Sequence, residues 1–170
     1  MTQPAYQRWV KEIRALLEEL GKQDFGYPVD KNEVLEPQRR VAGLPPDLEP
    51  LYEVCDGVSL PDVHVGYFLH PARRVVSAAK RGEPTRIEGK TRIPVHVFGS
   101  DGGGGRFALA DDRAIYYLPS GGAVIRGAFL EDKQVKAIRK ASSVAEFLRL
   151  LRADVEAFVN GVDGHRYLTG

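Results

Sequence analysis

Between residues 93 and 129, short apolar segments alternate with turns rich in glycine and aspartate, and this spacing limits the possible folds most strongly. The apolar segments span residues 93–98, 106–110, 114–118 and 123–129. Short strands at such regular intervals are typical of an antiparallel meander. Residues 134–140 could add one more extended segment, although Val135 and Ile138 are too few to decide.

Amphipathic helices are expected on both sides of this β-rich centre. In residues 4–20, apolar side chains recur at helical spacing, and Gly21 is a natural residue to end the helix. Near the other end of the chain, Ser143 and Glu146 fit a capping box, in which the two side chains satisfy each other's backbone donors. The helix that starts there is expected to end at Gly161.

Two shorter helices and a strand are expected between the first helix and the meander. Leu-Pro-Pro-Asp at residues 44–47 opens one helix, because proline suits the first turn and aspartate complements the positive end of the helix dipole. Its apolar face consists of Leu48, Leu51, Tyr52 and Cys55. Pro71 opens the other short helix, and Gly82 stops it. Residues 63–69 are expected to form a strand, and residues 22–43 an irregular stretch with room for one short strand.

The charges balance overall but are unevenly distributed. The 24 Lys and Arg residues against 23 Asp and Glu residues leave a net charge of +1, which does not favour nucleic acid or a membrane as the partner. Residues 41–72 contain no Lys or Arg, whereas residues 73–92 contain seven. One acidic and one basic surface are therefore expected.

The chain has features of a cytoplasmic protein. Cys55 is the only cysteine, so neither an intrachain disulfide nor a cysteine-rich zinc site is possible. The first residues lack the apolar segment of a signal peptide, and no apolar run is long enough to cross a membrane. No internal repeat or linker divides the sequence, and residues 162–170 are expected to form a loose tail.

Candidate catalytic and metal sites are weak. The glycine run at residues 101–106 lacks the Lys-Ser/Thr pair of a phosphate loop, so a flexible hairpin turn is expected there. Ser100 lies close to a G-x-S-x-G pattern, but nothing local supplies a base for it. The histidines form no metal-binding pair. The sequence therefore predicts no enzyme, no catalytic residue, no metal and no cofactor.

Two other residues that could serve a site are expected in the core. Cys55 lies on the apolar face of its helix and is interpreted as a small core residue. Trp9 on the first helix is expected to anchor that helix in the core. A position facing a partner, as a binding hot spot, remains the alternative for Trp9.

Three segments together resemble the SUKH superfamily, which contains fungal cell-wall-synthesis regulators and many bacterial immunity proteins. The first runs from the leucine-proline opening at residue 44 through Tyr52 to Asp56-Gly57. The second is the strand and glycine-rich turn at residues 93–104, followed by the strands at 106–110 and 115–118. The third is the helix start at residues 141–148. A longer, basic insertion at about 70–92 departs from the family pattern, so the resemblance does not indicate which surface contacts the partner.

The resemblance implies a single α+β domain over residues 1–170, in which helices pack against an antiparallel β-sheet, with a family-like core at about 44–161. It also implies a non-catalytic protein-binding role, most often the neutralisation of a polymorphic toxin. Many such toxins are nucleases. An intracellular regulatory or scaffold protein that binds an endogenous partner is the alternative function. The oligomeric state is left undetermined.

The acidic stretch provides the candidate contact residues. A nuclease presents a basic groove, so an acidic inhibitor surface could occupy that groove and bind quickly through electrostatic steering. The candidates are Asp47, Glu49, Glu53, Asp56 and Asp62. Helix capping and solubility are the alternative roles of these five side chains.

Overall fold

A mainly antiparallel sheet with helices packed against one face forms a single α+β domain, as the sequence predicts. The computed structural model describes residues 1–24, 31–162, 164 and 166–169. The strands are β1 (Glu33–Val34), β2 (Val58–Leu60), β3 (Tyr67–Leu69), β4 (Arg86–Glu88), β5 (Arg92–Asp101), β6 (Arg106–Ala110), β7 (Ile115–Leu118), β8 (Ala123–Ile125), β9 (Ala128–Leu130) and β10 (Ile138–Ala141). The helices are α1 (Gln3–Leu20), α2 (Glu49–Tyr52), α3 (Ala72–Val76), the 3₁₀ turn η1 (Ala79–Arg81) and α4 (Val144–Val159).

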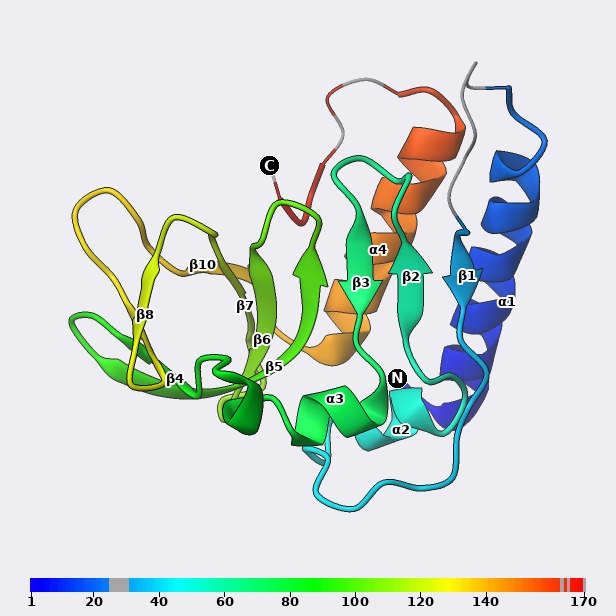
Figure 1. Cartoon of the computed structure of the whole chain (residues 1–170). Helices are drawn as coiled ribbons and strands as arrows, with labels where there is room; N and C mark the ends of the chain where they lie inside the picture. Colours follow the sequence, from blue (N-terminus) through cyan, green and yellow to red (C-terminus); the bar gives the residue numbers. More distant parts are fainter. Residues whose placement is uncertain (25–30, 163, 165, 170) are drawn as a thin grey trace.

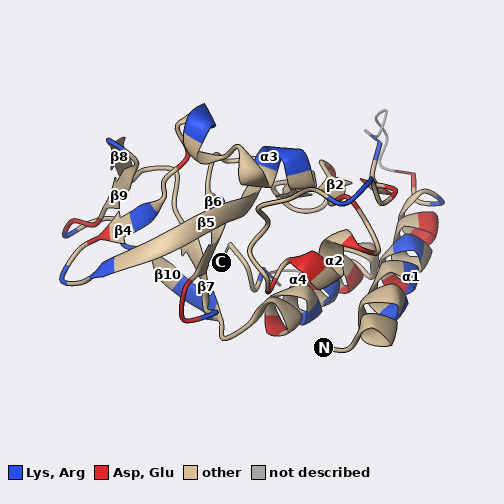
Figure 2. Cartoon of the chain, turned by 90° about the horizontal axis from the view of Figure 1, so that it is seen from below, with Lys and Arg blue, Asp and Glu red and all other residues tan. Residues whose placement is uncertain are grey.

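The long strand β5 belongs to both parts of the sheet. Its second half joins the antiparallel series β1-β2-β3-β5-β6-β7-β10. Its first half pairs with β4, which continues through β9 to β8. The strands β4, β9 and β8, here called the flap, bend toward the side of the sheet opposite α1 and α4 (Figures 1 and 2). The pairing of β4 with β9 is parallel.

The strand β6 separates two hydrophobic cores. Phe107 and Leu109 point into the main core, which the sheet forms with α1, α2 and α4. Ala108 and Ala110 point the other way, into a smaller core beneath the flap. Because neighbouring residues of a strand point to opposite faces, both faces of β6 are covered.

The two long helices form as predicted. The Trp9 indole is buried and its Nε1 donates a hydrogen bond to the Leu148 carbonyl at 2.8 Å, so α1 is anchored to α4. Ser143 accepts a hydrogen bond from the Glu146 amide at the start of α4. The Glu146 carboxylate accepts from the Ser142 amide, one residue before the cap, so the capping box is slightly displaced.

Several shorter elements differ from the prediction. The expected helix from residue 44 has only the four residues of α2, yet its predicted apolar face is buried. The strand expected over 63–69 is confined to β3, because Gly66 has a φ of +84° and closes a turn with Val63. The short strand β2, just before that turn, was not predicted. The extended segment considered at 134–140 forms only at its end, as β10.

The segment 123–129 is a hairpin and not a single strand. Arg126 and Gly127 have φ values of +49° and +72°, and the residues on either side of them pair with each other. Two left-handed residues between paired strands are typical of a type I′ turn, which reverses the chain within two residues. This turn creates β8 and β9 and therefore the flap.

The tail prediction is wrong for the last described residues. The Leu168 side chain is completely buried in the main core. The buried Asp154 carboxylate of α4 accepts hydrogen bonds from the Tyr167 amide at 2.7 Å and the Leu168 amide at 3.1 Å. A buried carboxylate needs such donors, and here the tail supplies them. Residues 163, 165 and 170 of the predicted tail lie outside the described residues.

The described helices are all too short or too polar to cross a membrane.

Candidate functional site

Two of the five predicted contact residues, Asp56 and Asp62, have structural roles. Asp56 Oδ1 accepts a hydrogen bond at 2.8 Å from the amide of Ala72, the first residue of α3. The Asp62 carboxylate accepts from Asn32 Nδ2 at 2.6 Å, which ties the β2–β3 turn to the segment before β1. The contact of Asp56 with the first amide of α3 is a form of helix capping, which the sequence offers as the alternative to partner binding.

The other three acidic residues lie around α2, and two of them form ion pairs with arginines. Asp47 forms an ion pair with Arg113 at 2.8 Å, and Glu49 forms one with Arg40 at 3.3 Å. Glu53 is exposed and has no charged partner among the described residues. The five acidic residues therefore do not form one continuous anionic surface.

A groove of about 240 Å³ does bring part of this acidic set together. Glu49, Glu53 and Asp56 line it, with Arg39 and Arg40 from the segment before α2. The mixture of charges means that this groove lacks the strong negative field expected of a nucleic-acid mimic. A contact between these acidic residues and a partner stays a prediction.

A more continuous surface lies on the side of the sheet that faces away from α1 and α4. Cross-strand pairing places one residue from each of five neighbouring strands in a single row. We call the members the outer row: Glu33, Ser59, Phe68, Ser100 and Arg106. Their strand neighbours, such as Leu60 and Tyr67, are buried in the main core, so the row must point to the opposite side.

The outer row is accessible to solvent. All five side chains are partly exposed, and the flap covers the sheet only at the β4 and β8 end. In Figure 1 the row's side of β1, β2 and β3 faces the reader, with α4 behind the strands. A cavity of about 500 Å³ is hollowed into this face, and Glu33, Ser59, Phe68 and Ser100 line it together with Arg74. We call this region, with its cavity, the open face.

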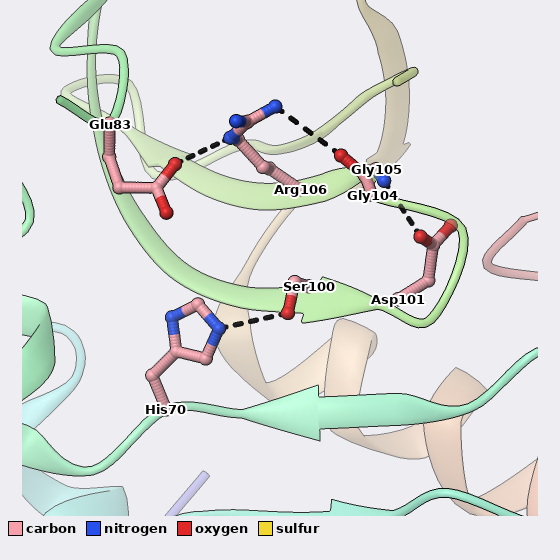
Figure 3. Close-up of polar contacts among 7 residues, drawn as sticks. All are labelled: His70, Glu83, Ser100, Asp101, Gly104, Gly105 and Arg106. Carbon is pink, nitrogen blue, oxygen red and sulfur yellow. Dashed lines mark hydrogen bonds and ion pairs between the residues drawn. The ribbon is translucent and has the colours of Figure 1, made fainter. Parts of the chain in front are cut away.

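His70 closes one side of the open face and contacts Ser100. It follows β3 directly, and its Nε2 lies 2.9 Å from Ser100 Oγ (Figure 3). Only 3% of the His70 surface is exposed. Burial lowers the pKa of the imidazole to about 4, and the charges of Arg74 and Arg106 act in the same direction. His70 is therefore neutral near pH 7.

The contact between His70 and Ser100 bears on the question of catalysis. The sequence offered no base for Ser100, and the structure brings one from 30 residues away. A nucleophilic serine needs a base that a third group holds in place. Within the described residues, no carboxylate contacts the His70 imidazole to orient it in this way. The pair connects the end of β3 to β5.

The stability of the protein should fall as the pH is lowered from about 6.5 toward 4. In this window the unfolded chain protonates His70 while the folded chain keeps it neutral. The unfolded state then binds more protons, so the free energy of unfolding decreases, by roughly 1–3 kcal/mol for a shift of this size. Urea melts across the window should show a smaller decrease for His70→Gln. An identical pH dependence in wild type and variant would contradict this assignment.

The glycine-rich run forms the hairpin between β5 and β6, as predicted. The Asp101 carboxylate holds it in place by accepting from the Gly105 amide at 2.7 Å and from the Tyr117 hydroxyl at 2.6 Å. A Cβ atom on Gly102 would lie 2.1 Å from the Val65 carbonyl oxygen, so only glycine allows this close packing. The run is explained by packing and not by phosphate binding.

Two arginines, Arg106 and Arg74, lie at the open face. Arg106 Nε donates to the Glu83 carboxylate, and this ion pair, little exposed, ties the segment after η1 to β6 (Figure 3). Arg74 is exposed on α3 and lines the cavity. No hydrogen bond or ion pair of its guanidinium exists in the part of the chain that the structure describes. The sequence indicates a basic insertion, but no local pattern indicates that this insertion lies beside the sheet.

Neither a metal centre nor a known relative explains this surface. The described residues contain no group of three or more His, Cys, Asp or Glu side chains that could hold a metal ion. Comparisons of the chain with protein-family models, with curated proteins and with solved structures give no match.

Proposed function

We propose that this chain is a non-catalytic protein-binding domain, and that it serves as an immunity protein that neutralises a bacterial polymorphic toxin. The observation that carries the binding role is the position of Phe68. This aromatic side chain lies at the centre of the outer row, between Ser59 and Ser100, on the face that points away from α1 and α4. Aromatic residues and arginine are enriched at protein interfaces, and central aromatic anchors provide much of the binding energy.

The immunity role is supported by the sequence resemblance to the SUKH superfamily. The segment from residue 44 to 57 forms α2, residues 93–104 form most of β5 and the glycine hairpin, and residues 141–148 form the start of α4. All three segments therefore contribute to the same sheet and helix layer. The second segment, through β5, also contributes to the open face, which β1, β2, β3 and β6 complete.

We expect the toxin encoded beside this gene to lose its effect on cell growth when the chain is produced with it. Phe68→Ala should reduce affinity for that toxin by at least about tenfold, because truncation of a central aromatic anchor typically costs about 2 kcal/mol or more. Ile125→Ala is the matched control, since Ile125 is an exposed apolar residue on β8 of the flap. Growth assays and binding kinetics provide the measurement.

The acidic residues are an alternative contact surface, and the same binding experiment distinguishes it from the surface around Phe68. If a basic toxin groove meets Glu49, Glu53 and Asp62, neutralising all three should slow association and weaken its dependence on salt. Full binding by Phe68→Ala together with slow binding by the acidic triple variant would assign the contact to the acidic residues of α2 and the β2–β3 turn and not to the open face. Binding of a host protein with no protection from the toxin would favour a regulatory or scaffold role. A substrate turnover that Ser100→Ala abolishes would contradict the non-catalytic assignment.

A further inference from the structure

We infer that Arg74 on the open face binds a carboxylate of an acidic peptide segment in the partner protein. This inference rests on the proposed protein-binding function and specifies the chemistry of the partner. It also assigns a role to part of the basic insertion at about 70–92, which has no counterpart in the family pattern that the sequence resembles.

The acidic residues around the cavity are already engaged by other groups. The Asp101 carboxylate accepts two hydrogen bonds, from Gly105 and Tyr117. Glu83 is paired with Arg106, and Glu33 is paired with Lys31 at 2.6 Å. Arg74 is thus left without a counter-charge among the described residues, at the rim of a cavity that it helps to line.

The surroundings add further positive charge to the rim. The next residue, Arg73, is also exposed and also lacks an ion pair in the described parts of the chain. Figure 2 shows the basic segment of α3 on the side of the sheet opposite α1 and α4. His70 adds no charge, because burial keeps its imidazole neutral near pH 7. A negatively charged partner segment is therefore attracted to this rim.

The contacts available at the open face suit a peptide carboxylate. A guanidinium can bind both oxygens of a carboxylate through two parallel hydrogen bonds. Ser59 offers a hydroxyl and Phe68 an apolar surface within the same cavity. One carboxylate, with the peptide around it resting on the strands, would satisfy Arg74 and cover Phe68 together.

Nucleic acid fits this face less well. Binding along a phosphate backbone requires a track of several cations, usually with aromatic side chains on which bases stack. Here Arg74 is the only cation without a resident partner among the described residues that line the cavity.

A peptide array tests the inference without knowledge of the partner. The probes are decapeptides with a central Glu or Asp among varied neighbours, each paired with its Gln or Asn counterpart. We expect the full chain to prefer the carboxylate member, and Arg74→Gln to lose that preference with a roughly ten- to hundredfold drop in affinity. Arg73→Gln is the matched control, because it removes the same charge from the same helix but not from the cavity. Arg74→Lys should retain part of the preference, since it keeps the charge and loses the paired hydrogen bonds.

In the peptide and oligonucleotide assays, three results would overturn the inference. One is the absence of any carboxylate preference in the wild-type chain, and another is an equal loss in Arg73→Gln and Arg74→Gln. The third is binding of a single-stranded oligonucleotide that Arg74→Gln abolishes while the acidic peptides do not bind. If the toxin is neutralised equally by wild type and Arg74→Gln, the proposed function stands and this inference fails. If the acidic peptides bind but no toxin is neutralised, the inference stands and the immunity role fails.

Discussion

Replacing Phe147 with alanine should lower the free energy of unfolding by about 3–5 kcal/mol, the usual cost of removing a buried aromatic ring. Phe147 of α4 is completely buried, with its ring centre 5.2 Å from that of Phe98 and 5.1 Å from that of Phe107. These rings join the helix layer to β5 and β6. The truncation would leave a cavity between the two layers, which the stiff sheet cannot fill by relaxing.

Urea melts provide the measurement for Phe147→Ala. Leu51→Ala is a second core test, because Leu51 of α2 is also completely buried, and it should cost about 2–5 kcal/mol. The control is Val76→Ala on α3, where 39% of the side chain is exposed and the change should be within about 0.5 kcal/mol. Losses below about 1 kcal/mol for both core variants would mean that the buried faces are assigned wrongly.

Removing the buried carboxylate with Asp154→Ala should cost about 2–4 kcal/mol and release the end of the chain. Asp154 is completely buried, and its oxygens accept hydrogen bonds from the Tyr67 hydroxyl at 3.0 Å and from the Tyr167 and Leu168 amides. Without the carboxylate the Tyr167 and Leu168 amides lose their acceptor, and an unsatisfied buried donor such as the Leu168 amide is costly. The Leu168 side chain should then leave the main core, which adds to the loss.

Hydrogen exchange separates the release of the tail from a general loss of stability. The Leu168 amide should exchange much faster in Asp154→Ala, even without denaturant, where the amides of the sheet remain protected. Tyr67→Phe serves as a comparison: it removes the hydroxyl that donates to Asp154 and lies 3.3 Å from Thr169 Oγ1, but it leaves the Tyr167 and Leu168 amides bonded to Asp154, so the Leu168 amide should stay protected. If Asp154→Ala leaves the exchange of Leu168 unchanged, the carboxylate does not hold the tail.

The two proposed binding features can be tested without disturbing this interior. Phe68 belongs to the outer row and Arg74 is exposed on α3, so neither contributes to the cluster around Phe147. Variants at these two positions should therefore unfold at nearly the same urea concentration as the wild type. Any loss of binding can then be attributed to the surface itself.

Elements with strong local signals follow from the sequence alone. The spacing of apolar residues in α1 and α4, and the cap at Ser143, predict both helices to within a few residues. The predicted strand at residues 106–110 coincides with β6, because glycine-rich and aspartate-rich turns delimit it. These signals lie between residues close in the chain, so no distant partner is needed to interpret them.

The tertiary structure alone decided how distant segments pair and which residues share a surface. Leu69 lies opposite Gly99, and this register places His70 beside Ser100, although neither residue carries a local sign of the other. The outer row arises in the same way from pairing across five strands. The acidic residues that are neighbours in sequence are instead divided between capping, ion pairs and a mixed groove. The physical reason is that helix caps, turns and amphipathic periods depend on nearby residues, whereas strand register is selected by the burial of whole faces of the sheet.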